Sequence, residues 1–255
     1  NYFSGIIAFE NKNNSKALDF FNSSKTLMDK HNSYLKKYIY TLVLENKIIQ
    51  ANNLIRQNID KENSKFLEAY LLLIVDSIKK NDLNKAENYI RSANNFIDQD
   101  RFNLAILESL EQYIFVFKEN RIMNNNKSFG KLSTISETLQ RCYLGDPKTE
   151  IYFSNLVNDI NGNFSRYIYF YMSYLIEQNR ISDASNLVSD IDYINATLLL
   201  AQGKSWIDNG KHYNFSKLFS CKNYKDIVSE FFFIISNLYS SENDFKRSNF
   251  YLNLS

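Results

Sequence analysis

The chain has 255 residues, 44% hydrophobic and 23% charged, which is the balance of an ordinary folded protein. Lys and Arg number 30 against 28 Asp and Glu, so the net charge of +2 and the pI near 8.3 argue against a nucleic-acid-binding surface. The strongest apolar runs, 70–75 and 231–235, are far shorter than the roughly 18 residues of a membrane-spanning helix.

Helical spacing of apolar residues divides most of the chain into predicted helix pairs. A phrase of the form Asn-x-apolar-x-x-Ala recurs at 46–51, 81–86 and 179–184, and weaker copies centre on Ala17, Ser216 and Ser248. Its small residues are spaced by 34 and 35 residues in the first part of the chain and by 32 and 32 in the last part. Such a period is typical of a helical repeat array. The predicted pairs are roughly 1–30, 33–59, 65–98, 102–142, 164–191, 195–220 and 226–255.

The middle of the chain departs from this period. Ala86 and Ala184 are 98 residues apart, which predicts an insertion between them. Gly145-Asp146-Pro147 is the clearest helix breaker, because Pro147 forces its predecessor out of the helical region. We therefore expect an N-terminal array over 1–142 with an irregular fourth pair, a linker with a short helix over 143–163, and a truncated C-terminal array over 164–255.

The pattern of these pairs resembles the tetratricopeptide repeat. The last pair carries it through Phe232, Ser236, Tyr239, Phe245, Ser248 and Leu252; the third through Tyr70, Leu73, Leu83, Ala86, Ile90 and Ala93; and the first through Gly5, Ala17 and Phe21. None of the copies has the terminal Pro that often closes the motif. The resemblance implies an all-α fold, a right-handed α-α superhelix of about six to seven helix pairs.

The same resemblance implies a non-catalytic scaffold that binds a protein or peptide partner on its concave face, with no cofactor. In such arrays the first helices of the pairs face inward. On this register the expected groove residues are Tyr40, Val43, Leu71, Val75, Tyr169, Ser173, Phe233 and Asn237. Aromatic and Asn side chains there suit an extended or helical peptide. Two alternatives stay open: an accessory region of a larger enzyme or secretion or envelope complex, and a peptide-sensing regulator with a separate DNA-binding domain.

Residues that suggest other chemistry have simpler interpretations. Gly203-Lys204-Ser205 ends like a phosphate-binding loop, but Leu198 stands where that loop needs a further Gly, so we expect helix packing. His31, at a predicted helix end, and His212 have no nearby cluster of Cys, His or carboxylate residues in the sequence, so we expect no metal site there. Cys142 and Cys221 have no metal-binding spacing and are interpreted as small, partly buried apolar residues. The sequence predicts no catalytic, cofactor-binding or metal-binding residue.

The chain starts at Asn1 without a Met and ends at Ser255 inside a predicted helix, so we expect a piece of a longer protein. The abundance of Asn, Lys, Ile, Phe and Tyr, all with AT-rich codons, indicates genome bias. We expect a bacterial protein, and the sequence leaves the cytoplasm and the periplasm equally open because a signal peptide cannot be judged.

Overall fold

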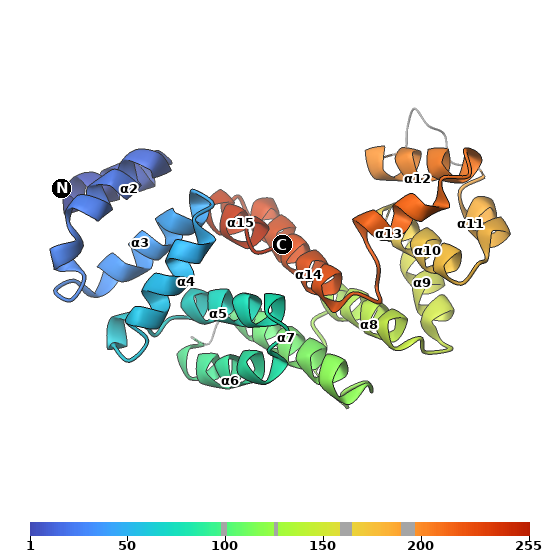
Figure 1. Ribbon diagram of the computed structural model, residues 1–255, viewed down its shortest axis with the longest axis horizontal. Coiled ribbons are helices and arrows are strands. Elements are labelled where there is room, and N and C mark those ends of the chain that lie inside the picture. Colours follow the sequence, from blue (N-terminus) through green and yellow to red (C-terminus); the bar gives the residue numbers. More distant parts are fainter. Residues whose placement is uncertain (98–100, 125–126, 159–164, 190–196) are drawn as a thin grey trace. The chain divides into compact units, whose positions relative to one another are not determined.

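Helices make up all the secondary structure in the part of the chain that the structure describes (Figure 1). This is a computed structural model, and it describes residues 1–97, 101–124, 127–158, 165–189 and 197–255. The prediction of an all-α fold is confirmed for these residues. Among them, no helix is both long and apolar enough to cross a membrane.

The α-helices are α1 (Tyr2–Glu10), α2 (Asn14–Ser23), α3 (Asn32–Leu44), α4 (Ile48–Gln57), α5 (Leu67–Lys79), α6 (Leu83–Ala93), α7 (Arg101–Glu119), α8 (Lys131–Leu144), α9 (Thr149–Val157), α10 (Ser165–Glu177), α11 (Ile181–Leu187), α12 (Leu198–Asp208), α13 (Phe215–Leu218), α14 (Tyr224–Ser241) and α15 (Phe245–Leu252). Short 3₁₀ helices cover Lys25–Leu27, Glu62–Ser64, Asn94–Phe96 and His212–Asn214.

One backbone turn joins the two helices of most pairs. It places a residue with positive φ just after the first helix, and these residues are Lys12, Asn46, Asn81, Asn179, Gly210 and Asn243, with φ between 57° and 67°. The next amide then donates back to a carbonyl five residues earlier, as from Asp82 to Ser77 at 2.9 Å. This hydrogen bond satisfies a carbonyl that the helix end leaves open. Asn and Gly tolerate the left-handed conformation best, which explains why Asn recurs in the repeated phrase.

The same turn occurs at Gly145 and changes the expected register of the middle region. Gly145 has φ 67°, and the amide of Asp146 donates to the carbonyl of Arg141 at 3.0 Å. Gly145 lies 64 residues after Asn81 and 34 before Asn179, close to two periods and one period. The earlier of the two periods between Asn81 and Gly145 contains α7, a single helix of 19 residues, in place of a helix pair. The expected insertion is therefore a pair in register, α8 with α9, whose turn has Gly in place of Asn. Residues 159–163 of the expected linker, and its boundary at 164, lie outside the described residues.

Small residues mark where most of the second helices pack. Ala17, Ala51, Ala86 and Ala184 are all completely buried, five residues after the left-handed residue of their turns. The prediction for Ser216 is wrong by one residue, because Ser216 is exposed and Phe215 is 1% exposed. An aromatic ring thus takes the small-residue position of that pair.

Two glycines allow close helix contacts. A Cβ on Gly5 would come within 3.0 Å of the Phe21 ring, and a Cβ on Gly203 within 3.0 Å of the Met172 Cε atom. Each glycine lies seven residues before the left-handed residue of its pair. The prediction that Gly203 serves helix packing is therefore confirmed.

Packing divides the chain into two compact units. The first comprises 1–114 with 229–255, and the second comprises 115–228. This division differs from the linear one expected from the repeats, because the last helix pair joins the first three. In the first unit α15 contacts α3 (Figure 1), although about 200 residues separate them in the chain.

In the second unit a disulfide joins Cys142, near the end of α8, to Cys221, between α13 and α14. Their Cα atoms are 5.8 Å apart, and both residues are buried. Lys222 adds a hydrogen bond from Nζ to the Cys142 carbonyl at 3.1 Å. The interpretation of the two cysteines as small apolar residues missed this disulfide, because their pairing depends on the tertiary fold and not on their spacing in the chain.

The register can be tested by overpacking a junction. Ala51→Leu and Ala86→Leu should each lower the free energy of unfolding by about 1–3 kcal/mol, because the added methyl groups force two helices apart. Ser216→Leu, at an exposed site, should change it by less than about 0.5 kcal/mol. Urea unfolding followed by helical circular dichroism measures all three. An unchanged free energy of unfolding in both Ala51→Leu and Ala86→Leu would contradict the repeat register.

The disulfide can be tested by removal. It closes a loop of 79 residues, so Cys142→Ser with Cys221→Ser should lower the free energy of unfolding by about 2–4 kcal/mol. A phosphine reductant should destabilise the natural chain to the level of the double variant and leave that variant unchanged. Two titratable thiols in the denatured, unreduced chain would contradict the pairing.

Candidate functional site

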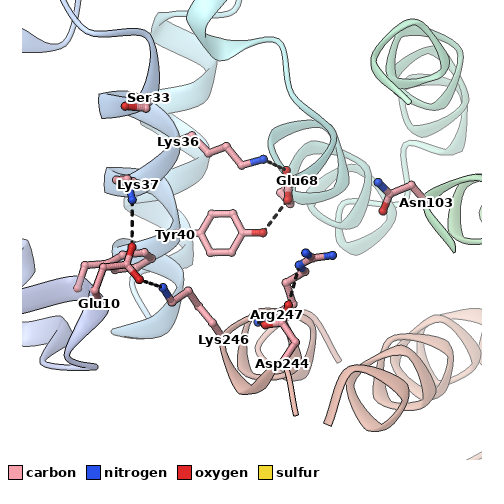
Figure 2. A pocket seen from close by; sticks show the side chains of 11 residues that line it. Glu10, Ser33, Lys36, Lys37, Tyr40, Glu68, Asn103, Asp244, Lys246 and Arg247 are labelled. Carbon is pink, nitrogen blue, oxygen red and sulfur yellow. Dashed lines mark hydrogen bonds and ion pairs between the residues drawn. The ribbon is translucent and has the colours of Figure 1, made fainter. Parts of the chain in front are cut away.

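A cavity of about 560 Å³ opens in the first unit, among helices from both ends of the chain (Figure 2). Its walls come from the end of α1, from α3, α5 and α7, and from α15 with the residue that caps it. The lining residues are Phe9, Glu10, Ser33, Lys36, Lys37, Tyr40, Glu68, Asn103, Asp244, Lys246 and Arg247. Four of these side chains are cationic and three are acidic, so the cavity has a net positive charge of one.

Glu10 joins three helices at one edge of the cavity. Its Oε1 accepts a hydrogen bond from Lys37 on α3 at 3.1 Å, and its Oε2 accepts one from Lys246 on α15 at 2.7 Å. These two lysines also lie over the ring of Phe9, at 5.4 and 4.2 Å from its centre. The hydrogen bond from Lys246, followed by that from Lys37, lowers the pKa of Glu10 against the opposing effect of burial.

Tyr40 on α3 and Glu68 on α5 line a second part of the cavity. The Tyr40 hydroxyl donates to Oε1 of Glu68 at 2.6 Å, and Lys36 Nζ lies 3.1 Å from Oε2 of the same carboxylate. Burial raises the pKa of Tyr40 well above its ordinary value, and the Glu68 carboxylate raises it further. The hydroxyl therefore stays protonated and remains a hydrogen-bond donor at neutral pH.

Arg247 and Asn103 approach from the opposite side (Figure 2). Arg247 Nε is 2.9 Å from Asp244, and its guanidinium lies 5.1 Å from the centre of the Tyr239 ring. Hydrogen bonding to Tyr239 contributes most to the raised pKa of Arg247. Asn103 on α7 supplies an amide that can both donate and accept. The chemistry that these side chains offer is ion pairing and hydrogen bonding.

Of the residues expected in the groove, Tyr40 alone lines this cavity. Five others are buried in the core and therefore present no surface to a partner: Val43, Leu71, Val75, Tyr169 and Ser173. Phe233 is half-buried and Asn237 is exposed, both on α14. Val43, Leu71 and Val75 therefore line no surface of the first unit, and Tyr169 and Ser173 belong to the second unit.

The core position of Leu71 and Val75 has a physical reason. Helix α5 is apolar on every side, and ten of its 13 residues are buried. A helix of this kind must be covered all round. Similarly, Tyr169 stacks on Phe215 at 5.2 Å, and the Ser173 hydroxyl donates to the Phe219 carbonyl at 3.0 Å, so both are committed to packing.

The charged residues around Tyr40 were missed because sequence reasoning assigned charges to solvated helix faces. The pairs that identify them are Glu10 with Lys37 and Tyr40 with Glu68, separated by 27 and 28 residues. Neighbouring first helices are about one period apart, so a search for a carboxylate and a hydrogen-bond donor at slightly less than one period could have found both pairs. The pair of Glu10 with Lys246, 236 residues apart, carries no such signal.

The two histidines lie in different local settings. His31 stacks on Tyr2 at 5.1 Å and lies at the start of α3, not at a helix C-terminus. His212 belongs to a 3₁₀ helix. The described residues contain no group of three or more His, Cys, Asp or Glu side chains that could hold a metal ion.

The lowered pKa of Glu10 predicts that the free energy of unfolding depends on pH. A lowered pKa in the folded state means that its carboxylate stabilises the fold above about pH 4.5 and that this stabilisation is lost as the pH falls below that value. The side chain is 53% exposed, so the effect is small. Glu10→Gln should lower the free energy of unfolding by about 0.5–1 kcal/mol at neutral pH and by nothing near pH 3. Asp19→Asn, on the exposed side of α2, is the control, and an equal loss in both variants would contradict the role of Glu10.

Comparison with protein-family models, with curated proteins and with solved structures finds no match to this chain. A helical fold alone does not specify a function, because many unrelated activities share one architecture.

Proposed function

We propose that this chain is a non-catalytic scaffold of the tetratricopeptide type, a superhelical array that binds a protein or peptide partner on the concave face of its first helices. The observation that carries the proposal is the cavity around Tyr40 and Glu68, which lies among α1, α3, α5 and α7. Helix pairs that share one turn and one period support the repeat architecture.

The size and lining of the cavity favour recognition of one or two partner side chains and a short stretch of backbone. Its volume of about 560 Å³ lies within the range of ligand sites in proteins. Asn103 and Arg247 can bond a backbone carbonyl, and Glu68 can accept from a backbone amide. Affinity from such contacts is salt-sensitive because the lining charges are partly exposed.

The disulfide supports the second candidate, an accessory region of a larger envelope or secretion complex. Disulfides persist in oxidising compartments and are rare in the cytosol. The pairing of Cys142 with Cys221 therefore favours export, and for a bacterial protein it favours the periplasm over the cytoplasm. In this candidate the same cavity binds another subunit of the complex.

The proposal predicts that short peptides selected on the full chain from a random displayed library bind at the cavity. Asn103→Ala with Arg247→Ala should weaken the selected peptides by about tenfold, because both variants remove hydrogen-bond donors to the partner. Fluorescence anisotropy of labelled peptides measures the affinity, and circular dichroism checks that the helix content is unchanged.

Lys85→Glu is the matched control, since it changes a charge on α6, a second helix whose residues do not line the cavity. Its affinity for the peptides should equal that of the natural chain. Equal affinity of the peptides for the Asn103→Ala, Arg247→Ala chain and for the natural chain would place the interface elsewhere. A library that yields no binder would contradict the proposed function.

A further inference from the structure

We call the surface that carries Glu10, Lys37, Tyr40 and Glu68 the first-helix face. The last helix, α15, covers part of this face. Helix α15 is only eight residues long, and the Asp244 side chain caps it by accepting from the Arg247 amide at 3.0 Å. Because residues four apart lie on one side of a helix, Lys246 and Phe250 point in the same direction.

Lys246 fits an acidic and aromatic recess. Its Nζ lies 2.7 Å from Glu10 and 4.2 Å from the centre of the Phe9 ring, so the ammonium group meets a carboxylate and a π face together. An opposite charge and an aromatic face both favour a cation. The recess formed by Phe9 and Glu10 is therefore complementary to a lysine.

Phe250 fits beside Tyr40. The two ring centres are 4.7 Å apart, and Phe250 is completely buried. The next residue, Tyr251, is 1% exposed; burial raises its pKa most, and Tyr239 and the Glu68 carboxylate raise it further. Phe250, one helical turn after the lysine, thus completes the contact of α15 with α3.

We propose that the first-helix face is a docking site for an amphipathic helix with a lysine and a phenylalanine four residues apart. Helix α15 is its resident occupant, and a partner helix of this chemistry binds by replacing α15. The inference rests on the proposed function and names the class of partner: a basic, aromatic helix that covers the face now covered by α15 and reaches into the cavity beside it.

Replacement is feasible because of how α15 is attached. A turn of three residues, 242–244, joins it to α14, and its ion pair with the half-exposed Glu10 is open to solvent screening. Other contacts of α15 are made with α14 and not with the first-helix face. They include a Tyr239–Tyr251 stack at 5.2 Å and a hydrogen bond between the hydroxyls of Ser236 and Ser248 at 3.2 Å.

The test supplies α15 in trans. A fluorescein-labelled peptide of residues 241–255 is titrated against the natural full chain and against a full chain with Lys246→Glu and Phe250→Ala, whose own α15 docks weakly. The variant should bind the peptide at least about tenfold more tightly, because its face is vacant. A peptide with the same two substitutions is the control and should not bind. Adding Glu10→Lys to the variant should abolish the gain.

A second measurement covers the case in which the variant does not fold. The ¹⁵N-labelled natural chain is mixed with excess unlabelled peptide, and amide hydrogen exchange is followed by mass spectrometry. Exchange within 248–252 should accelerate, because the peptide displaces α15, while exchange in α2 stays constant. Unchanged exchange in 248–252 at excess peptide, or equal affinity of the peptide for both chains, would overturn the inference.

This outcome is separate from that of the library selection. If selected peptides need Asn103 and Arg247 but the peptide of 241–255 fails, the cavity binds partners unlike α15 and the further inference alone is wrong. If that peptide binds while no library peptide depends on the cavity, the proposed function is wrong in its placement of the interface.

Discussion

The left-handed residue that ends the first helix of each pair is the constraint on which the rest of the structure depends. A chain that turns at Asn46 or Asn81 hydrogen-bonds its last helical carbonyls and reverses direction within a few residues. The second helix then begins with a fixed offset, which brings Ala51 or Ala86 against the preceding helix. Because the offset repeats, each of these pairs places its second helix against its first in the same way. Gly145 performs the same turn in α8–α9, so the constraint also orders the middle of the chain.

The last helix pair determines which part of the first-helix face is open to a partner. In the first unit α15 contacts α3 and covers Tyr40 with Phe250, which leaves an opening beside Glu68 and Arg247. Without α15 the aromatic ring of Tyr40 and the recess at Phe9 would face solvent. The cavity and the docked helix are therefore two parts of one surface, and both follow from the chain's return to its first repeats.

Sequence reasoning reaches the fold class and the pair register wherever the signal is local. The period of Asn and Ala residues predicted the turns at 46, 81 and 179, because a left-handed turn and a buried small residue both restrict residue type at one position. It missed Gly145 since the Gly-Asp-Pro step was interpreted as a break, and it misplaced Ser216 because Phe215 fills the small-residue site. The site was out of reach for a different reason. Tyr40 has a local signal, but Glu10, Glu68 and Lys246 become a site only through contacts between helices, and the disulfide of Cys142 with Cys221 depends on the same kind of contact.

The central claim is that α15 lies on the first helices of the same chain, and carbodiimide cross-linking tests it most directly. The reagent joins a carboxylate to a lysine in contact without a spacer. In monomeric protein, mass spectrometry should find Glu10 joined to Lys246 as well as to Lys37, since both lysines lie within 3.1 Å of its oxygens. A cross-link to Lys37 without any to Lys246 would contradict the account, because it would show α1 and α3 in place and α15 elsewhere.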